Sequence, residues 1–165
     1  MKIRPKIKFI KTPFDWCVET ATSLFLLAHW FVVLLFYFKL PETIPVHYNG
    51  VGEIDGWGSK STIWLLPVIS TLSYIGFHFL QILFDNIYDE QSSEILCVKI
   101  FAVMKMSLIL CFTLIDIQIL QDALNTFWFM RFGMLYAVLV LMGIAIVYYT
   151  VKMLIVYCAL LDIEK

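Results

Sequence analysis

Long apolar stretches separated by short polar segments dominate the pattern of this chain. A helix that crosses about 30 Å of hydrocarbon needs about 20 residues, because each residue adds about 1.5 Å along the axis. The stretches of this length predict helices at about residues 19–38, 63–84, 105–121 and 132–157. None shows the alternation of a membrane β-strand, so the pattern favours helices over a barrel. The predicted fold class is an all-α membrane protein with four transmembrane helices and a structured extracytoplasmic loop between the first two.

Composition strengthens this prediction. Hydrophobic residues make up 61% of the 165 residues and aromatic residues 16%, whereas charged residues make up only 15%. A soluble fold of this size has too little interior to bury so much apolar surface, and a bilayer removes that difficulty. We therefore expect one four-helix transmembrane domain over residues 1–165, with the lipid bilayer as its main partner.

The distribution of basic residues predicts the orientation. The residues that precede the first apolar stretch include Lys2, Arg4, Lys6, Lys8 and Lys11. Positive charge near a membrane helix favours the cytoplasmic side, so the N-terminus is predicted to be cytoplasmic. A fourth crossing returns the C-terminus to the same side. The first stretch is too long for the apolar part of a signal peptide, so we expect a retained helix.

The predicted loop at residues 39–62 is long and contains several residues that fix the backbone. Proline fixes φ and favours extended geometry at the preceding residue, and Asn-Gly and Asp-Gly are typical of tight turns. These residues are Pro41, Pro45 and the dipeptides Asn49-Gly50 and Asp55-Gly56. We expect an extended entry, two tight turns and a return to the membrane.

The segment LPETIPVHYNGVGEIDGWGSK closely resembles the signature of a bacterial membrane domain of unknown function, the DUF sixteen-forty-eight domain. The matching positions are Leu40, Pro41, Ile44, Pro45, His47, Tyr48, Asn49, Gly52, Asp55, Trp57, Gly58 and Lys60. The chain also resembles the N-terminal part of the immunity family that protects sporulating bacilli from a sibling-killing peptide toxin. The resemblance implies a multi-pass protein of the bacterial cytoplasmic membrane and an immunity-type role.

The residue types in the loop allow three interpretations. His47 and Asn49 can hydrogen-bond the loop backbone, so that the loop braces the fold. His47, Glu53 and Asp55 can together ligate a divalent cation, because carboxylate and imidazole groups are common metal ligands. Trp57 and Tyr48 can contact a peptide, a lipid headgroup or a neighbouring protein outside the membrane. The bracing role is favoured, and no bound metal or cofactor is predicted.

Several ionisable residues fall inside the predicted membrane helices, where each needs a partner because charge is costly in hydrocarbon. His29 lies near the centre of the first helix, His78 in the inner half of the second and Asp116 near the centre of the third. His29 and Asp116 differ in predicted depth by about 4 Å, which predicts a contact between them. Glu19 and Lys152 are predicted to meet near the cytoplasmic boundary. Interhelical hydrogen bonds are favoured over a proton or ion relay through His29, Asp116 and His78.

The sequence contains no catalytic signature. HExxH, GxSxG, a phosphate-binding glycine loop and CxxC are all absent, so no enzyme activity and no catalytic residue are predicted. The net charge of −1 and the lack of a basic-aromatic patch argue against a nucleic-acid partner.

The expected function is therefore binding, sensing or an immunity-type role, exercised through the outer loop toward a peptide or protein outside the membrane. The alternative is a small transporter or proton-coupled channel. That alternative favours a homo-oligomer, because four short helices enclose little space.

Overall fold

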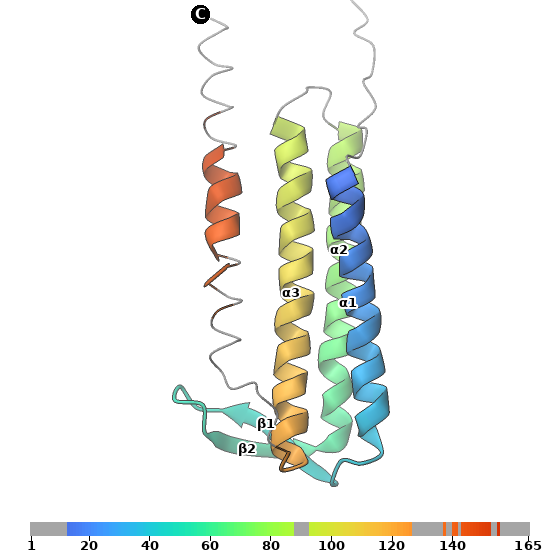
Figure 1. Ribbon diagram of the computed structural model, residues 1–165, viewed down its shortest axis with the longest axis vertical. Helices are drawn as coiled ribbons and strands as arrows, with labels where there is room; N and C mark the ends of the chain where they lie inside the picture. The colour runs from blue at the N-terminus through green and yellow to red at the C-terminus, as the bar shows by residue number, and fades with distance from the viewer. Residues whose placement is uncertain are drawn as a thin grey trace, which may run out of the picture.

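The computed structural model describes residues 13–87 and 93–126, together with residues 137, 140, 141, 143–152 and 155. In chain order the elements are α1 (Pro13–Tyr37), β1 (Thr43–Tyr48), β2 (Ile54–Ser59), the short 3₁₀ helix η1 (Lys60–Trp64), α2 (Leu65–Ile87) and α3 (Ser93–Ala123). The three long helices stand side by side, and the β1–β2 hairpin crosses the end of the bundle where α1 ends and α2 begins (Figure 1).

Three helices within the described residues are long and apolar enough to cross a membrane. Their spans are Asp15–Tyr37, Lys60–Leu83 and Lys99–Ala123. They suggest a multi-pass membrane protein, as the hydropathy pattern predicted. The predicted fourth helix at 132–157 lies largely outside the described residues, although 143–152 are helical. The basic residues that predict the orientation also lie outside the described part.

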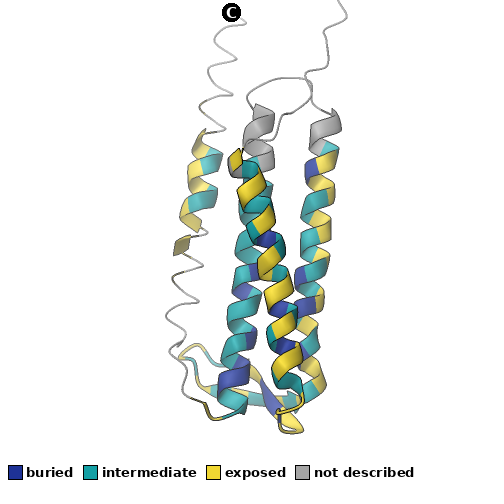
Figure 2. Cartoon of the chain, turned by 45° about the vertical axis from the view of Figure 1, so that its right-hand side comes forward, coloured by how far each residue is buried: buried dark blue, intermediate teal, exposed yellow. Residues whose placement is uncertain are grey.

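The outer surface of the bundle is apolar, unlike that of a soluble protein, and its interior contains polar side chains as well as apolar ones. Large apolar side chains cover its outer surface, including Leu24, Leu27, Phe31 and Leu34 on α1 and Leu65, Leu72, Ile75 and Phe79 on α2. Among the residues that the structure describes, the buried polar side chains are Thr22, His29, Ser70, Gln81, Lys105, Asp116 and Gln121. Figure 2 shows the exposed stripe that runs along the outside of the helices. Apolar side chains outside and polar ones inside match a lipid environment, where polar groups face the bundle interior.

The helices are longer than hydropathy alone predicted. α1 begins at Pro13 instead of near residue 19, and proline at the first position of a helix has no N–H that needs an acceptor. α3 begins at Ser93, twelve residues before the predicted start at 105. A hydropathy pattern detects only the part of a helix that suits lipid, whereas helix propensity also extends through polar residues.

The loop between α1 and α2 contains a small sheet, which corrects the all-α prediction to a mostly helical fold. β1 and β2 pair antiparallel, with Thr43 opposite Ser59, Ile44 opposite Gly58 and Pro45 opposite Trp57. Asn49 and Gly50 lie at the turn between the strands, as predicted. The turn predicted at Asp55-Gly56 is wrong, because both residues belong to β2.

Close approach between the strands explains why glycine occupies position 56. A Cβ atom at Gly56 would lie 2.8 Å from Cβ of His47, and one at Gly58 would lie 2.9 Å from Cγ1 of Val46. Carbon atoms that are not bonded to each other do not approach this closely. Glycine in a strand often marks close approach of another chain segment, and here it admits the partner strand's side chains.

The hairpin packs onto the bundle through an apolar cluster. Ile44 of β1 is completely buried, and the cluster consists of Val33, Leu40, Ile44, Ile63, Ile119 and Leu120. It therefore joins the end of α1, the hairpin, η1 and the end of α3 into one packed unit.

Candidate functional site

The hairpin is attached to α3 by a polar contact as well as by apolar packing. The hydroxyl of Tyr48 donates a hydrogen bond of 2.8 Å to Oδ2 of Asp122, and Nε2 of Gln118 donates one of 2.9 Å to the same oxygen. Burial raises the pKa of the Tyr48 phenol above its ordinary value, and the hydrogen bond to Asp122 raises it further. The phenol therefore keeps the proton that it donates.

Asn49 organises the turn of the hairpin. Its Oδ1 accepts hydrogen bonds from the backbone N–H groups of Val51 and Glu53, at 3.1 and 2.9 Å. Its Nδ2 donates to Oε2 of Glu53 at 3.0 Å. Gly52 has φ of 85°, a left-handed conformation that glycine adopts without steric cost. These contacts agree with the interpretation in which Asn49 braces the loop.

His47 and Asp55 form a pair on the outside of the hairpin. Nδ1 of His47 lies 2.5 Å from Oδ1 of Asp55, and their side chains are 72% and 43% exposed. Glu53 instead contacts Asn49, so it does not complete the three-ligand cation site considered from the sequence. Within the described residues no group of three His, Cys, Asp or Glu side chains is arranged to hold a metal ion.

One face of β2 is open to the surroundings. Exposure alternates along the strand, so Asp55, Trp57 and Ser59 are exposed whereas the residues between them are half-buried. The indole of Trp57 is 62% exposed. We call His47, Asp55 and Trp57 the hairpin face. It combines an imidazole, a carboxylate and a large aromatic ring outside the core.

The remaining signature residues hold the base of the hairpin. Nζ of Lys60 donates to Oε1 of Glu42 at 2.8 Å, and the Lys60 N–H donates to the Glu42 carbonyl at 3.0 Å. Pro45 is buried in β1, whereas Pro41 is exposed in the connection from α1. The contacts between Lys60 and Glu42 close the hairpin where β1 begins and β2 ends.

The predicted contact between His29 and Asp116 is confirmed. Nε2 of His29 lies 2.6 Å from Oδ2 of Asp116, and both residues are completely buried. On its other side, Nδ1 of His29 lies 3.3 Å from Oγ of Ser70. This buried triad joins α1, α2 and α3. Oδ1 of Asp116 is also buried, and no described residue gives it a hydrogen bond.

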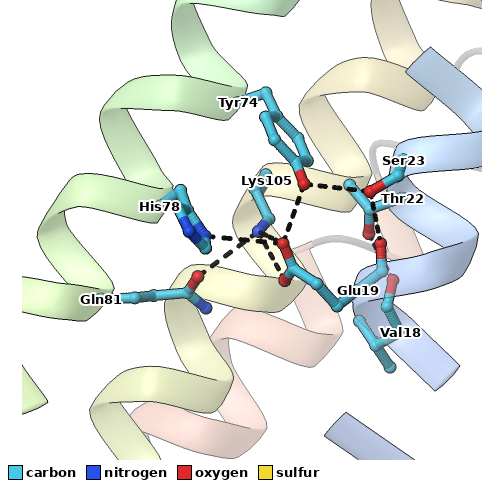
Figure 3. A network of polar contacts seen from close by, with 8 residues as sticks. All are labelled: Val18, Glu19, Thr22, Ser23, Tyr74, His78, Gln81 and Lys105. Carbon is cyan, nitrogen blue, oxygen red and sulfur yellow. Dashed lines mark hydrogen bonds and ion pairs between the residues drawn. The ribbon is translucent and has the colours of Figure 1, made fainter. Parts of the chain in front are cut away.

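A second polar cluster surrounds Glu19 nearer the end of the bundle opposite the hairpin (Figure 3). Nζ of Lys105 donates to both carboxylate oxygens of Glu19, at 2.8 and 2.7 Å, and the hydroxyl of Tyr74 donates to Oε1 at 3.0 Å. Nδ1 of His78 lies 3.6 Å from the same oxygen. The prediction that Glu19 meets Lys152 is wrong. Nζ of Lys152 instead lies over the ring of Tyr148.

His78 therefore belongs to the Glu19 cluster and not to the His29–Asp116 pair. Its ring stacks on that of Tyr74, with centroids 6.2 Å apart and planes 6° from parallel. A proton or ion relay would need His29, Asp116 and His78 in one contiguous path. The described side chains instead form two separate clusters.

Lys105 and Asp122 were the main residues that the sequence prediction missed. The hydropathy pattern predicts that Lys105 lies at the start of the third helix, where a basic residue is common. Because α3 begins at Ser93, Lys105 lies well inside it and its side chain is completely buried. The sequence does contain a signal for this pair. Lys105 lies beside an apolar run, and Glu19 of another helix lies at a similar depth in the membrane.

Comparison with known proteins supports the domain identified from the hairpin sequence. Residues 24–71 match the family model described as "Domain of unknown function (DUF1648)", which covers the second half of α1, the hairpin and the start of α2. An uncharacterized protein of Archaeoglobus fulgidus is 39% identical over 44 residues, which are 27% of this chain and 24% of that protein. The match thus spans about a quarter of that relative. No solved structure matches the chain.

Proposed function

We propose that this protein is a non-enzymatic protein of the cytoplasmic membrane that binds a peptide or protein partner through its hairpin face. The observation that carries the proposal is the exposed Trp57 on a hairpin that is braced from several sides. Tyr48 joins the hairpin to α3, and Lys60 with Glu42 closes its base. Tryptophan is enriched among the residues that contribute most to binding, and a braced site loses little conformational entropy when it binds.

The hairpin is proposed to face away from the cytoplasm. The basic residues near the N-terminus precede α1, and α1 begins at the end of the bundle opposite the hairpin (Figure 1). Basic segments are retained on the cytoplasmic side, so the opposite end would lie outside.

An immunity-type or sensing role follows from this placement. A peptide that reaches the membrane from outside would meet the hairpin face before the helices. The transporter alternative has less support, because Glu19 and Asp116 contact basic groups of other helices across the bundle and do not line a described cavity.

A labelling experiment tests the orientation. In a variant without native cysteines, Ser59→Cys is treated with a membrane-impermeant maleimide in intact cells. Labelling without cell lysis is expected, because Ser59 is exposed on β2. Labelling that requires lysis contradicts the proposed outer position.

A variant pair tests the binding role. Trp57→Ala removes the aromatic ring of the hairpin face, whereas Trp16→Ala removes a ring of 59% exposure near the start of α1. Cells are challenged with peptide fractions secreted by competing strains. For Trp57→Ala we expect protection against the peptides, or the response to them, to fall at least tenfold while the amount of protein in the membrane is unchanged. Trp16→Ala should behave like the wild type. Equal effects of the two variants would contradict a role of the hairpin face.

A further inference from the structure

The middle of the bundle contains an acid and a base that are in direct contact and completely buried. His29 and Asp116 are completely buried within two helices long enough to span the membrane, with 2.6 Å between Nε2 and Oδ2. One carboxylate oxygen is thereby occupied. The other, Oδ1, is buried without a hydrogen bond from any described residue. An acceptor left open in hydrocarbon is costly, and it marks where a further donor can bind.

The charge of the pair depends on how many protons it holds. A neutral imidazole beside a carboxylate leaves a net charge of −1. One additional proton makes the pair neutral overall, whether the proton lies on the ring or on the carboxyl group. A second additional proton leaves a net charge of +1. Because net charge is costly in hydrocarbon, the state with one additional proton is favoured.

Within the part of the chain that the structure describes, no neighbouring group offers this pair a compensating charge. From α2 the contact is the neutral hydroxyl of Ser70. The other titratable or charged groups described in the interior of the bundle are Glu19 on α1, Tyr74 and His78 on α2, and Lys105, Cys111 and Asp122 on α3. Glu19 contacts both Lys105 and His78, and Lys105 precedes Asp116 by eleven residues, about 16 Å along the helix. Asp122 is an acid, about 9 Å from Asp116 along the helix, and accepts from Tyr48.

We propose that His29 and Asp116 form a proton-binding site in the middle of the membrane, and that loss of its proton loosens α1 from α2 and α3. The ligand is a single proton, and Oδ1 of Asp116 is the acceptor through which a proton or a water molecule enters. With the proton bound, the neutral pair holds the three helices together. Without it, the uncompensated carboxylate favours an arrangement in which water reaches Asp116. This inference does not depend on what the hairpin binds.

Distance measurements in lipid nanodiscs test the proposal. Leu27 on α1 and Leu72 on α2 are 66% and 63% exposed, so spin labels at Leu27→Cys and Leu72→Cys leave the interior intact. All native cysteines are replaced. The label-to-label distance is measured between about pH 6 and pH 10, a range that covers the ordinary titration of histidine. A reversible increase in distance is expected as the pH rises. A distance that stays constant across this range in the folded protein overturns the proposal.

Substitutions assign the response to the pair. Asp116→Asn removes the charge that needs the proton, so the distance should become independent of pH. His29→Gln removes the ring that shares the proton, so the pH at which the distance increases should differ from that of the wild type, and this variant suffices if Asp116→Asn does not fold. The double variant Glu19→Gln/Lys105→Met should retain the wild-type pH response. A wild-type response in Asp116→Asn, or in His29→Gln, overturns the proposal, as does its loss in the Glu19/Lys105 double variant.

Discussion

Tyr48 and Asp122 are separated by 74 residues in sequence, and a hydrogen bond of 2.8 Å joins them at the end of the bundle. The bond links β1 to the last turn of α3, so the hairpin is held by a helix to which it is not directly connected. The orientation of the hairpin face therefore depends on a contact between distant parts of the chain.

Tyr48→Phe should destabilise the protein by about 1.5–3 kcal/mol, the usual contribution of a hydrogen bond to a charged group. The aromatic ring remains, so packing is preserved. Unfolding in mixed detergent micelles measures the change. Tyr37→Phe is the matched control, because that ring packs against Trp64 and no described hydrogen bond involves its hydroxyl. A loss in Tyr37→Phe as large as in Tyr48→Phe would contradict the assignment.

Stability should fall at alkaline pH partly because of Tyr48. Its pKa is raised in the folded protein, so the unfolded chain releases the phenolic proton first, near pH 10. The contribution of Tyr48 is thus complete below about pH 10 and declines as the pH rises further. The free energy of unfolding of Tyr48→Phe should decline less steeply between about pH 9.5 and pH 11 than that of the wild type. Parallel declines would show that Tyr48 is not responsible.

Gly56→Ala should distort the hairpin, because the added Cβ would lie 2.8 Å from Cβ of His47. A destabilisation of about 1–3 kcal/mol is expected, as for other overpacked sites. Gly50→Ala provides the comparison, since no atom lies within 4 Å of a Cβ at that position. Thermal unfolding of both variants measures the difference, and an equal effect at the two glycines would argue against close approach as the cause.

Lys105→Met should be among the most damaging single substitutions in the helices. It leaves Glu19 without the cation that contacts both of its carboxylate oxygens. Removal of one member of a buried ion pair typically costs about 3–5 kcal/mol. Glu19→Gln/Lys105→Met removes both charges and should recover most of that loss. Membrane level and unfolding in detergent measure both variants, and a double variant no more stable than Lys105→Met would refute the pairing argument.

The depth of a residue in the membrane was predictable from the sequence. This depth alone was enough to predict the contact between His29 and Asp116. His29 and Asp116 each lie near the middle of an apolar run, and few other ionisable groups lie at that depth. The same reasoning does not identify the partner of Glu19, because the hydropathy pattern predicts that Lys105 lies at a helix end. The choice between Lys105 and Lys152 also requires knowing which helix faces α1.

The hairpin also contains one feature that the local sequence predicts and one that it does not. Asn49-Gly50 forms a turn because Asn49 bonds to backbone groups within four residues, so local sequence contains the necessary information. Asp55-Gly56 has an equally strong local preference for a turn, yet it lies in a strand. The deciding contact is across the sheet, where His47 needs the space that glycine leaves. A cross-strand contact of this kind depends on register, which the dipeptide itself does not encode.

The sequence by itself determined that long apolar helices suit a bilayer and that a turn-rich segment joins the first two, because hydropathy and turn preference are properties of neighbouring residues. Only the tertiary structure decided that this segment pairs into a hairpin, that Tyr48 reaches Asp122, and that Glu19 meets Lys105. Each of these depends on the direction in which a side chain points once the helices have packed. Apolar length fixes the depth of a residue in the membrane, whereas its partner depends on the rotation of its helix about the helix axis.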